Sequence, residues 1–390
     1  MRPQSNTIFV VAGESSGDRE AAHLIQEIKK RMPELNFVGL GGHHMKETGV
    51  EILHDLIRLA VIGLWEVIRK YIPIRRIFDD AVRYIDKEKP RAVLLVDYPG
   101  FNLRLAKKIK KTGVPVIYYI SPQIWAWGKQ RTQMIANVVD FMMTLFPFEP
   151  AVYSETNLKV EFVGHSLRDR VKPSHPREQL RQEFGLNSPS IVLACGSRVN
   201  EVKKILPVML ASAELILKDI PEAQFILAES PTITEELYNR YLPKYAHLPI
   251  QRIRNRLYDV ATASDAAMVA SGTATLETAL CGTPFIVLYK VTWSTYWLGR
   301  LLIQIPYIGL ANVVAGKKVA PEYIQHDATP EKVSREMIHL IQHPERQQRI
   351  KKMLNAIKVK LGPGQAEERA AEAFVKFLQN NQTPAEHITA

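Results

Sequence analysis

Short apolar runs alternate with helical patterns along this chain, and this alternation restricts its fold more than any other feature. Residues 19–32 carry Ala21, Leu24 and Ile25 on one helical face, between apolar runs at 7–12 and 37–41. Continuous apolar runs are typical of strands buried on both faces, and parallel strands need crossover helices between them. The pattern therefore predicts an α/β fold with a parallel, doubly wound sheet. The strands expected in the first half are residues 7–12, 37–41, 92–96, 114–120, 141–145 and 160–163.

The same pattern begins again after a polar, proline-containing segment at residues 171–177. A chain of 390 residues also exceeds the usual size of one domain. We therefore expect two Rossmann-like domains, residues 1–172 and 173–363, and a closing helix near 364–380 that is free to pack back on the first domain. The strands expected in the second domain are residues 191–194, 224–227, 266–269 and 285–288.

Composition and charge exclude several classes of protein. Hydrophobic residues make up 46% of the chain, which favours a folded protein with large buried sheets over a disordered one. The net charge of +11 favours polyanionic partners, but the chain has no basic tail and no RNA-binding signature, so we expect no nucleic acid. Two cysteines make no disulfide framework. Because we find no export signal and no spanning apolar stretch, we expect a cytoplasmic protein whose membrane contact is peripheral.

The sequence GESSGD at residues 13–18 lies where the first strand ends and the first helix begins. Ligands of open α/β sheets bind at this edge, and the free N–H groups of a helix start attract an anion or a sugar hydroxyl. The turn lacks the dinucleotide and Walker patterns. It does match the G-x-S-x-G elbow of α/β-hydrolases, with Ser15 as nucleophile, although that elbow normally follows several earlier strands. A hydrolase is therefore the weaker alternative, and a purely capping role for Ser16 and Asp18 remains open.

Asp97 directly follows the apolar run at residues 92–96 and precedes the turn YPGFN. A carboxylate at the carboxyl end of a parallel strand faces the ligand edge, where it is suited to act as a general base. The alternative is a cap on the helix that begins near Phe101. Trp125 and Trp127, at the end of a later strand, are candidates either for a sugar or acyl platform or for core packing.

In the second domain, the turn CGSR at residues 195–198 follows a strand and opens a helix. It offers backbone N–H groups and the Arg198 guanidinium to a diphosphate, and Glu201 follows in the first helical turn. No two aspartates in the chain are separated by a single residue, so the D-x-D motif that can hold a metal ion against a diphosphate is missing. We therefore expect helix N-termini and basic side chains, rather than a metal, to stabilise a leaving diphosphate.

A second turn with nucleotide-binding features follows the apolar strand at 266–269. Ser271, Gly272 and Thr273 open a helix there. Glu277 lies one turn inside that helix, where it can accept hydrogen bonds from ribose hydroxyls. Capping by the serine and the threonine is compatible with this role.

Residues 60–78 mix apolar and basic side chains in a way that is typical of a helix lying in a membrane interface. The alternative is a buried helix with a basic outer face, because Pro73 interrupts the pattern. The residues expected to meet the acceptor or the bilayer here are Ile62, Leu64, Trp65, Val67, Ile68, Arg69, Lys70 and Ile72.

Nine segments in the same order resemble the lipid-A-disaccharide synthase family over nearly the whole chain. They are VAGESSGD, LAVIGLWEV, VDYPGFN, YYISPQIWAW, FPFE, FVGHS, GSRVNEV, ASGTATLE and ANVVAG. The resemblance implies the GT-B fold, in which two Rossmann-like domains face each other across a cleft. It also implies an acceptor site in the first half and a UDP-sugar site in the second. One departure is Cys195, which stands where the family usually has proline.

The reaction that the resemblance implies is an inverting transfer of 2,3-diacylglucosamine from its UDP conjugate to the 6-hydroxyl of 2,3-diacylglucosamine 1-phosphate. UDP leaves, and no cofactor is expected. The enzyme would work at the inner face of the inner membrane, in peripheral contact with anionic lipid. A homodimer is left open. Another UDP-sugar transferase of the GT-B class is the main alternative.

By matching position, the resemblance makes Asp97 the catalytic residue and Glu14 a second acid near the acceptor, with Ser15 and Ser16 beside it. The donor-site residues that it implies are Gly196, Ser197, Arg198, Glu201, Ser271, Gly272, Thr273, Ala274, Glu277 and Asn312.

Overall fold

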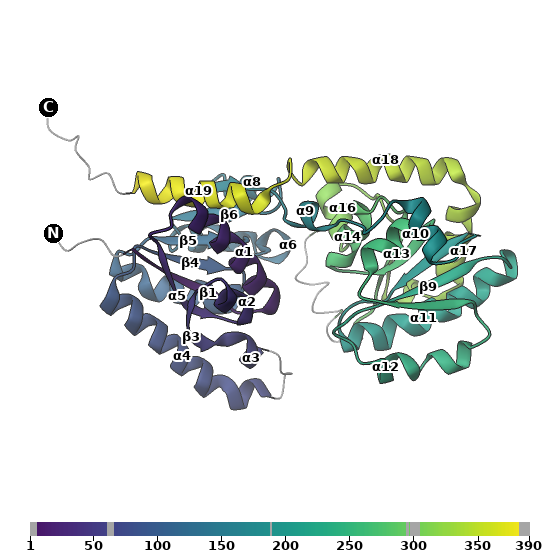
Figure 1. The fold of residues 1–390 in the computed structure, drawn as a ribbon, viewed down its shortest axis with the longest axis horizontal. Helices are drawn as coiled ribbons and strands as arrows, with labels where there is room; N and C mark the ends of the chain where they lie inside the picture. The colour runs from purple at the N-terminus through teal and green to yellow at the C-terminus, as the bar shows by residue number, and fades with distance from the viewer. Residues whose placement is uncertain (1–5, 61–65, 188, 294–295, 297–304, 382–390) are drawn as a thin grey trace. The chain divides into compact units, whose positions relative to one another are not determined.

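The computed structural model describes residues 6–60, 66–187, 189–293, 296 and 305–381, which form two compact units (Figure 1). The first unit is Met1–Ser166 with Pro363–Ala390, and the second is Leu167–Gly362. The first crossing between the units therefore comes six residues earlier than the expected boundary at 172. The reason is that the short helix α9 (Leu167–Arg170) belongs to the second unit.

A seven-stranded parallel sheet in the order β3-β2-β1-β4-β5-β6-β7 forms the centre of the first unit. Its central strands are fully buried because helices cover both faces of the sheet. The strands are β1 (Thr7–Ala12), β2 (Asn36–Gly41), β3 (Glu51–Asp55), β4 (Ala92–Val96), β5 (Val116–Tyr119), β6 (Phe141–Thr144) and β7 (Lys159–Phe162). The helices are α1 (Ser15–Arg31), α2 (His43–Glu47), α3 (Leu56–Ala60), α4 (Glu66–Glu88), α5 (Pro99–Ile109), α6 (Ile124–Trp127), α7 (Thr132–Ala136), α8 (Glu149–Val152) and α19 (Ala366–Asn380), with 3-10 turns η1 (Lys110–Thr112) and η2 (Lys129–Arg131).

The last helix, α19, belongs to the core of the first unit although it follows the whole second unit in the chain (Figure 1). Its Ala370, Phe374 and Phe377 share one apolar cluster with α1 and with one face of the sheet. The ring of Phe377 stacks on that of Phe141 in β6, with centroids 5.0 Å apart. Helices α4 and α5 cover the opposite face.

The second unit repeats the plan with a six-stranded parallel sheet in the order β10-β9-β8-β11-β12-β13. Its strands are β8 (Ser190–Ala194), β9 (Gln224–Glu229), β10 (Ile250–Arg254), β11 (Ala266–Ala270), β12 (Phe285–Tyr289) and β13 (Glu322–Ile324). Its other helices are α10 (Arg177–Glu183), α11 (Val199–Asp219), α12 (Glu235–Asn239), α13 (Leu257–Ala263), α14 (Thr273–Leu280), α16 (Leu310–Ala315), α17 (Pro330–Gln342) and α18 (Pro344–Lys360), with 3-10 turns η3 (Leu242–Tyr245) and η4 (Gln325–Asp327). The prediction of two doubly wound parallel sheets is confirmed.

Three strands were not expected from the sequence: β3, β10 and β13. All three lie at sheet edges. An edge strand is paired on one side only and keeps polar, exposed side chains, as Gln251, Arg252 and Arg254 do in β10. Such a strand lacks the continuous apolar run that identifies the central ones.

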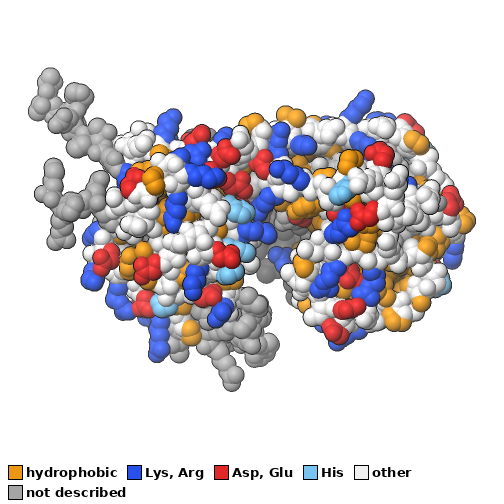
Figure 2. Space-filling model, in the orientation of Figure 1, with side chains coloured by type: hydrophobic (Ala, Val, Ile, Leu, Met, Phe, Trp, Pro, Cys, Tyr) orange, Lys and Arg blue, Asp and Glu red, His pale blue; other side chains and the backbone are white. Residues whose placement is uncertain are grey.

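The surface carries both signs of charge. On the face seen in Figure 2, Lys and Arg side chains are spread over both units and lie among Asp and Glu side chains. Within the described part of the chain, no helix combines the length and apolar character needed to cross a bilayer.

Candidate functional site

Strands β1 and β4 are neighbours, and their last residues, Ala12 and Val96, are paired in register. The turns that follow them therefore start side by side at the carboxyl edge of the sheet. Gly13 is required there, because a Cβ at this position would lie 2.0 Å from Cδ1 of Tyr98. Helix α1 then begins, and a Cβ on its Gly17 would lie 3.9 Å from Cβ of Asp97. The sequence GESSGD and Asp97, predicted as parts of one site, are thus brought together.

The backbone at this edge is strained. Asp97 has φ of 48° and Tyr98 has φ of 45°, so two consecutive non-glycine residues occupy the left-handed region. This conformation costs about 1–2 kcal/mol per residue. Strain of this kind is concentrated at functional sites, where the surrounding structure has to hold it.

Burial raises the pKa of the Asp97 carboxyl to about 6, and the negative charge of Glu14 adds to the effect. Helix α5 begins at Pro99, with Tyr98 at its N-cap position and no side-chain hydrogen bond from that residue. The helix therefore starts two residues before the Phe101 start on which the capping alternative for Asp97 rested. A partly buried carboxyl with a raised pKa is suited to proton transfer near neutral pH.

The other residues of the GESSGD turn divide into two groups. Glu14, Ser15 and Ser16 are exposed, and among the described residues the Ser15 hydroxyl has no hydrogen-bonded base. Asp18, in contrast, is buried and accepts hydrogen bonds from the backbone N–H groups of Gly42, at 2.7 Å, and His44, at 3.0 Å. Asp18 therefore caps the start of α2, whereas the sequence suggested that it caps α1.

Trp125 packs in the core, so its alternative as a sugar or acyl platform is wrong. The side chain is 6% exposed. Its Nε1 donates to Oε1 of Glu149 at 3.2 Å, and its ring meets that of Phe148 edge to face. Burial raises the pKa of Glu149 to about 7. The sequence prediction for Trp127 concerns a side chain outside the described ones.

In the second unit, the turn after β8 satisfies its own hydrogen-bonding groups. Oε2 of Glu201 accepts hydrogen bonds from the N–H groups of Ser197, at 3.1 Å, and Arg198, at 3.3 Å, and its Oε1 lies 3.1 Å from Nη1 of Arg198. A Cβ on Gly196 would lie 2.4 Å from Oε2 of Glu201, so only glycine fits. An acid in the first helical turn commonly caps the helix in this way. The N–H groups expected to face a diphosphate are therefore occupied by Glu201 in this structure, and its expected role as a donor-site residue stays a prediction.

The turn after β11 has the predicted strand, turn and helix. Ser271 Oγ donates to the carbonyl of Ile308 at 3.1 Å, and α14 starts at the exposed Thr273, followed by the partly buried Ala274. Gly272 has φ of 147° and open space around the position of a Cβ. Oε1 of Glu277 accepts a hydrogen bond from the Tyr258 hydroxyl at 2.9 Å. Because β8 and β11 are paired, the two turns of the second unit lie at the same sheet edge.

Asn312, the remaining residue of the expected donor site, lies in α16 and makes its hydrogen bonds within the second unit. It is fully buried. Its Nδ2 donates to the carbonyl of Ala320 and to Oε1 of Glu322, at 2.7 and 2.8 Å. Its Oδ1 accepts from the N–H groups of Val319 and Ala320, at 2.8 and 2.9 Å. These hydrogen bonds hold the loop after α16. The expected part of Asn312 in the donor site stays a prediction.

The predicted membrane segment lies mostly outside the described residues. Ile62, Leu64 and Trp65 belong to 61–65, and the side chains of Val67, Ile68, Arg69, Lys70 and Ile72 are also outside the described ones. The described part of α4 beyond Pro73 packs its Ile77 and Ala81 into the core. The interfacial role stays a prediction.

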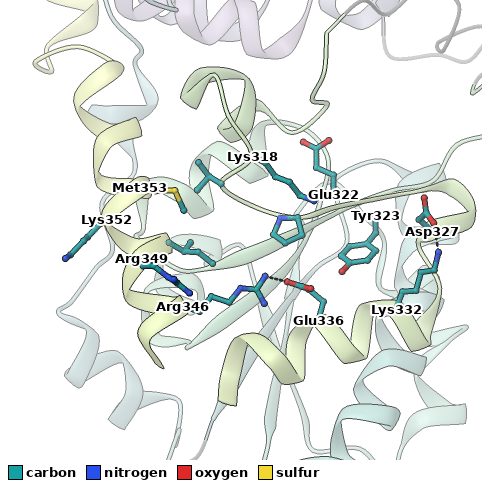
Figure 3. Close-up of a pocket in the computed structure, with 13 residues that line it drawn as sticks. Lys318, Glu322, Tyr323, Asp327, Lys332, Glu336, Arg346, Arg349, Lys352 and Met353 are labelled. Carbon is teal, nitrogen blue, oxygen red and sulfur yellow. Dashed lines mark hydrogen bonds and ion pairs between the residues drawn. The ribbon is translucent and has the colours of Figure 1, made fainter. Parts of the chain in front are cut away.

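A depression of about 740 Å³ lies elsewhere in the second unit, beside β13, α17 and α18 (Figure 3). Two ion pairs lie in its walls: Arg346 with Glu336, and Lys332 with Asp327. None of its lining residues comes from the turns after β8 and β11. The depression is therefore separate from the residues that the sequence assigned to a donor site.

Comparison with known proteins gives relatives along the whole chain. The family profile described as lipid-A-disaccharide synthetase matches residues 8–377. The lipid-A-disaccharide synthase of Nitrosococcus oceani is 44% identical over 381 residues, which cover 97% of this chain and 98% of that protein. The enzyme of the same name from Syntrophus aciditrophicus is 43% identical over 379 residues, which cover 97% and 99%.

Solved structures with the same architecture are much more distant in sequence. The calicheamicin glycosyltransferase CalG4 matches with a TM-score of 0.58 at 13% identity, over 98% of this chain and 100% of that one. A UDP-GlcNAc 2-epimerase from Neisseria meningitidis bound to UDP-GlcNAc matches with a TM-score of 0.57 at 16% identity, over 96% and 99%. These likenesses establish the GT-B fold alone. From the family match, the chain belongs to the lipid-A-disaccharide synthase family of glycosyltransferases.

Proposed function

We propose that this chain joins two acylated glucosamines into the lipid A disaccharide, with Asp97 as the general base. The transferred group is 2,3-diacylglucosamine from its UDP conjugate, and the acceptor is the 6-hydroxyl of 2,3-diacylglucosamine 1-phosphate. Relatives named for this activity that match the chain end to end support the reaction. The observation that carries the choice of base is the strained, partly buried Asp97 carboxyl at the end of a central strand, with its pKa raised to about 6.

The chemistry is a single displacement. The acceptor oxygen attacks C1 of the donor sugar while the bond from C1 to the diphosphate oxygen breaks and its electron pair leaves with UDP. Asp97 takes the proton of the attacking hydroxyl, which makes that oxygen a better nucleophile. A carboxyl with pKa near 6 is ionised at neutral pH and is a stronger base than an ordinary aspartate. Glu14 is exposed, and its part is to keep that pKa raised.

The departing diphosphate is neutralised by the second unit. Arg198 is largely exposed after β8, where its guanidinium can swing from Glu201 to the phosphate oxygens. The N-termini of α11 and α14 add partial positive charge from the same sheet edge. Glu277 exchanges the Tyr258 hydroxyl for ribose hydroxyls. No metal is needed in this scheme.

Both substrates carry acyl chains that have to leave a bilayer, so the enzyme acts in peripheral contact with the inner face of the membrane. The segment around residues 60–78 makes this contact through its apolar and basic side chains. This part of the proposal rests on the composition of the segment.

The test is Asp97→Asn, assayed by mass spectrometry of the disaccharide product with acylated and non-acylated acceptors. We expect kcat to fall by about 10²–10⁴, because the amide cannot accept the proton. Asp86→Asn, which changes an exposed aspartate on α4, is the control and should leave kcat unchanged. In the parent enzyme, kcat/KM should fall as the pH drops below about 6, where Asp97 becomes protonated. An unchanged rate in Asp97→Asn would refute the choice of base.

A further inference from the structure

Two buried side chains hold the peptide of Asp97 in place. The hydroxyl of Tyr118, in the neighbouring strand β5, donates to the carbonyl oxygen of Asp97 at 2.5 Å. Nδ2 of Asn102, in the first turn of α5, donates to the same oxygen at 2.7 Å and to the carbonyl of Val96 at 3.2 Å. Both side chains are fully buried. The one carbonyl that links the end of β4 to the strained turn therefore receives two internal donors.

Each of these two side chains acts as a donor here. Burial, with a contribution from the charge of Asp97, raises the pKa of Tyr118 well above its ordinary value, so the phenol keeps its proton. Both amide hydrogens of Asn102 go to carbonyls, and its buried Oδ1 finds no hydrogen-bond partner among the described residues. An orphaned buried acceptor is costly. The contribution of Asn102 therefore comes from the two carbonyls that its Nδ2 binds.

The conformation that these donors hold is one that aspartate and tyrosine do not favour. Asp97 and Tyr98 have φ of 48° and 45°, so the backbone turns here instead of continuing as an extended strand. This turn sets the direction in which the Asp97 side chain points. If the carbonyl lost a donor, the turn would relax and move the carboxyl with it. The position of the Asp97 carboxyl therefore depends on the two hydrogen-bond donors.

We propose that the Tyr118 hydroxyl, assisted by Asn102, is a positioning residue that locks Asp97 in its left-handed conformation and so aims its carboxyl at the acceptor. The inference rests on the proposed function of Asp97 as base. In a purely structural role, the hydroxyl would only satisfy a buried carbonyl, and its loss would change the stability of the protein without changing the pH dependence of catalysis.

The pH dependence distinguishes the two roles. The groups that act on the Asp97 carboxyl are Glu14 from the turn after β1, Glu20 from α1, and the backbone N–H of Tyr98. Its burial and the proximity of Glu14 raise its pKa, and both depend on the locked turn. Once the turn relaxes, the carboxyl is better hydrated and further from these acids. Its pKa then falls towards that of an ordinary aspartate.

The experiment is steady-state kinetics of Tyr118→Phe over a range of pH, with both substrates varied. We expect kcat to fall about tenfold to hundredfold, as for a misplaced catalytic group, with both KM values nearly unchanged. The acid limb of kcat/KM should move to lower pH. Tyr153→Phe is the matched control: Tyr153 is also buried, and its hydroxyl lies 3.0 Å from Ser121 Oγ, in a hydrogen bond that does not involve Asp97. It should keep the parental kcat and acid limb.

A folded Tyr118→Phe enzyme with parental kcat and an unmoved acid limb would overturn the inference. Asn102→Ser gives a second route if Tyr118→Phe does not fold: a lowered kcat with a shifted acid limb supports the inference, and parental values overturn it. Asp97→Asn separates this inference from the function beneath it. If that variant keeps its rate, the base assignment itself fails; if it loses its rate while Tyr118→Phe does not, only the positioning role fails.

Discussion

The turn after β4 and the turn after β8 each follow a central strand at the carboxyl edge of their sheet, and they are organised in opposite ways. The turn after β4 is partly buried, strained and held by donors from neighbouring elements, with an acid whose pKa is raised. The turn after β8 is exposed and closed on itself by Glu201. The comparison indicates that the turn after β4 is organised before substrate binds. In the turn after β8, a phosphate has to replace the Glu201 carboxylate as the partner of Arg198 and the N–H groups.

Replacing Arg198 gives the largest effect expected from this comparison. If the guanidinium leaves Glu201 to neutralise the leaving diphosphate, Arg198→Ala should lower kcat by about 10²–10³, the range for loss of one preorganised electrostatic donor. The measurement is single-turnover kinetics, which isolates the chemical step. Arg240→Ala, on an exposed arginine that follows α12, is the control. Loss of helix stability without loss of the chemical rate would assign Arg198 to capping alone.

Gly13→Ala sharpens the other side of the comparison. The added methyl would overlap the Tyr98 ring at 2.0 Å, and overpacking of this kind costs about 1–3 kcal/mol. We expect that loss in the free energy of unfolding by urea, together with a lower kcat because Asp97 precedes Tyr98. Gly100→Ala is the control, since a Cβ there meets nothing within 4 Å. Equal stability of the two variants would show that the turn after β4 is less rigid than described.

Glu201→Gln should give the smallest effect, and the direction of the change in UDP affinity distinguishes two roles for Glu201. Removing the negative charge that competes for Arg198 and its N–H groups should tighten UDP binding by about threefold to tenfold, as measured by calorimetry. The sequence-based role of Glu201 as a donor-site ligand predicts the reverse, weaker binding. Glu214→Gln, on an exposed residue further along α11, controls for the change in net charge.

The sequence predicted the centre of each sheet better than its edges. Ile8 to Ala12 and Ala92 to Val96 are apolar without interruption because helices cover both faces, and that signal is local. The polar β10 carries no such signal and becomes a strand only by pairing with β9. Contacts between residues far apart in the sequence could not be predicted either. Asp18 caps a helix more than 20 residues away, and the Asn312 amide forms hydrogen bonds with the loop that follows α16.

The site shows the same limit. The spacing of GESSGD and the position of Asp97 after a strand were sufficient to place both at one sheet edge. The contact made by Tyr118 could not be predicted, because in the sequence this residue is indistinguishable from any other residue of an apolar strand. Its hydroxyl binds the carbonyl at the end of a different strand. The choice between a platform and core packing for Trp125 could not be made from the sequence for a related reason: its partner, Glu149, comes from another segment of the chain.

The return of α19 to the first unit has a consequence for how the polypeptide is made. Phe374 and Phe377 complete a core whose other members, such as Ile25 and Phe141, emerge from the ribosome hundreds of residues earlier. During translation, the second unit is therefore complete before the first one is sealed. Nascent chains that stop short of residue 366 would display an uncovered apolar surface of the kind that chaperones bind.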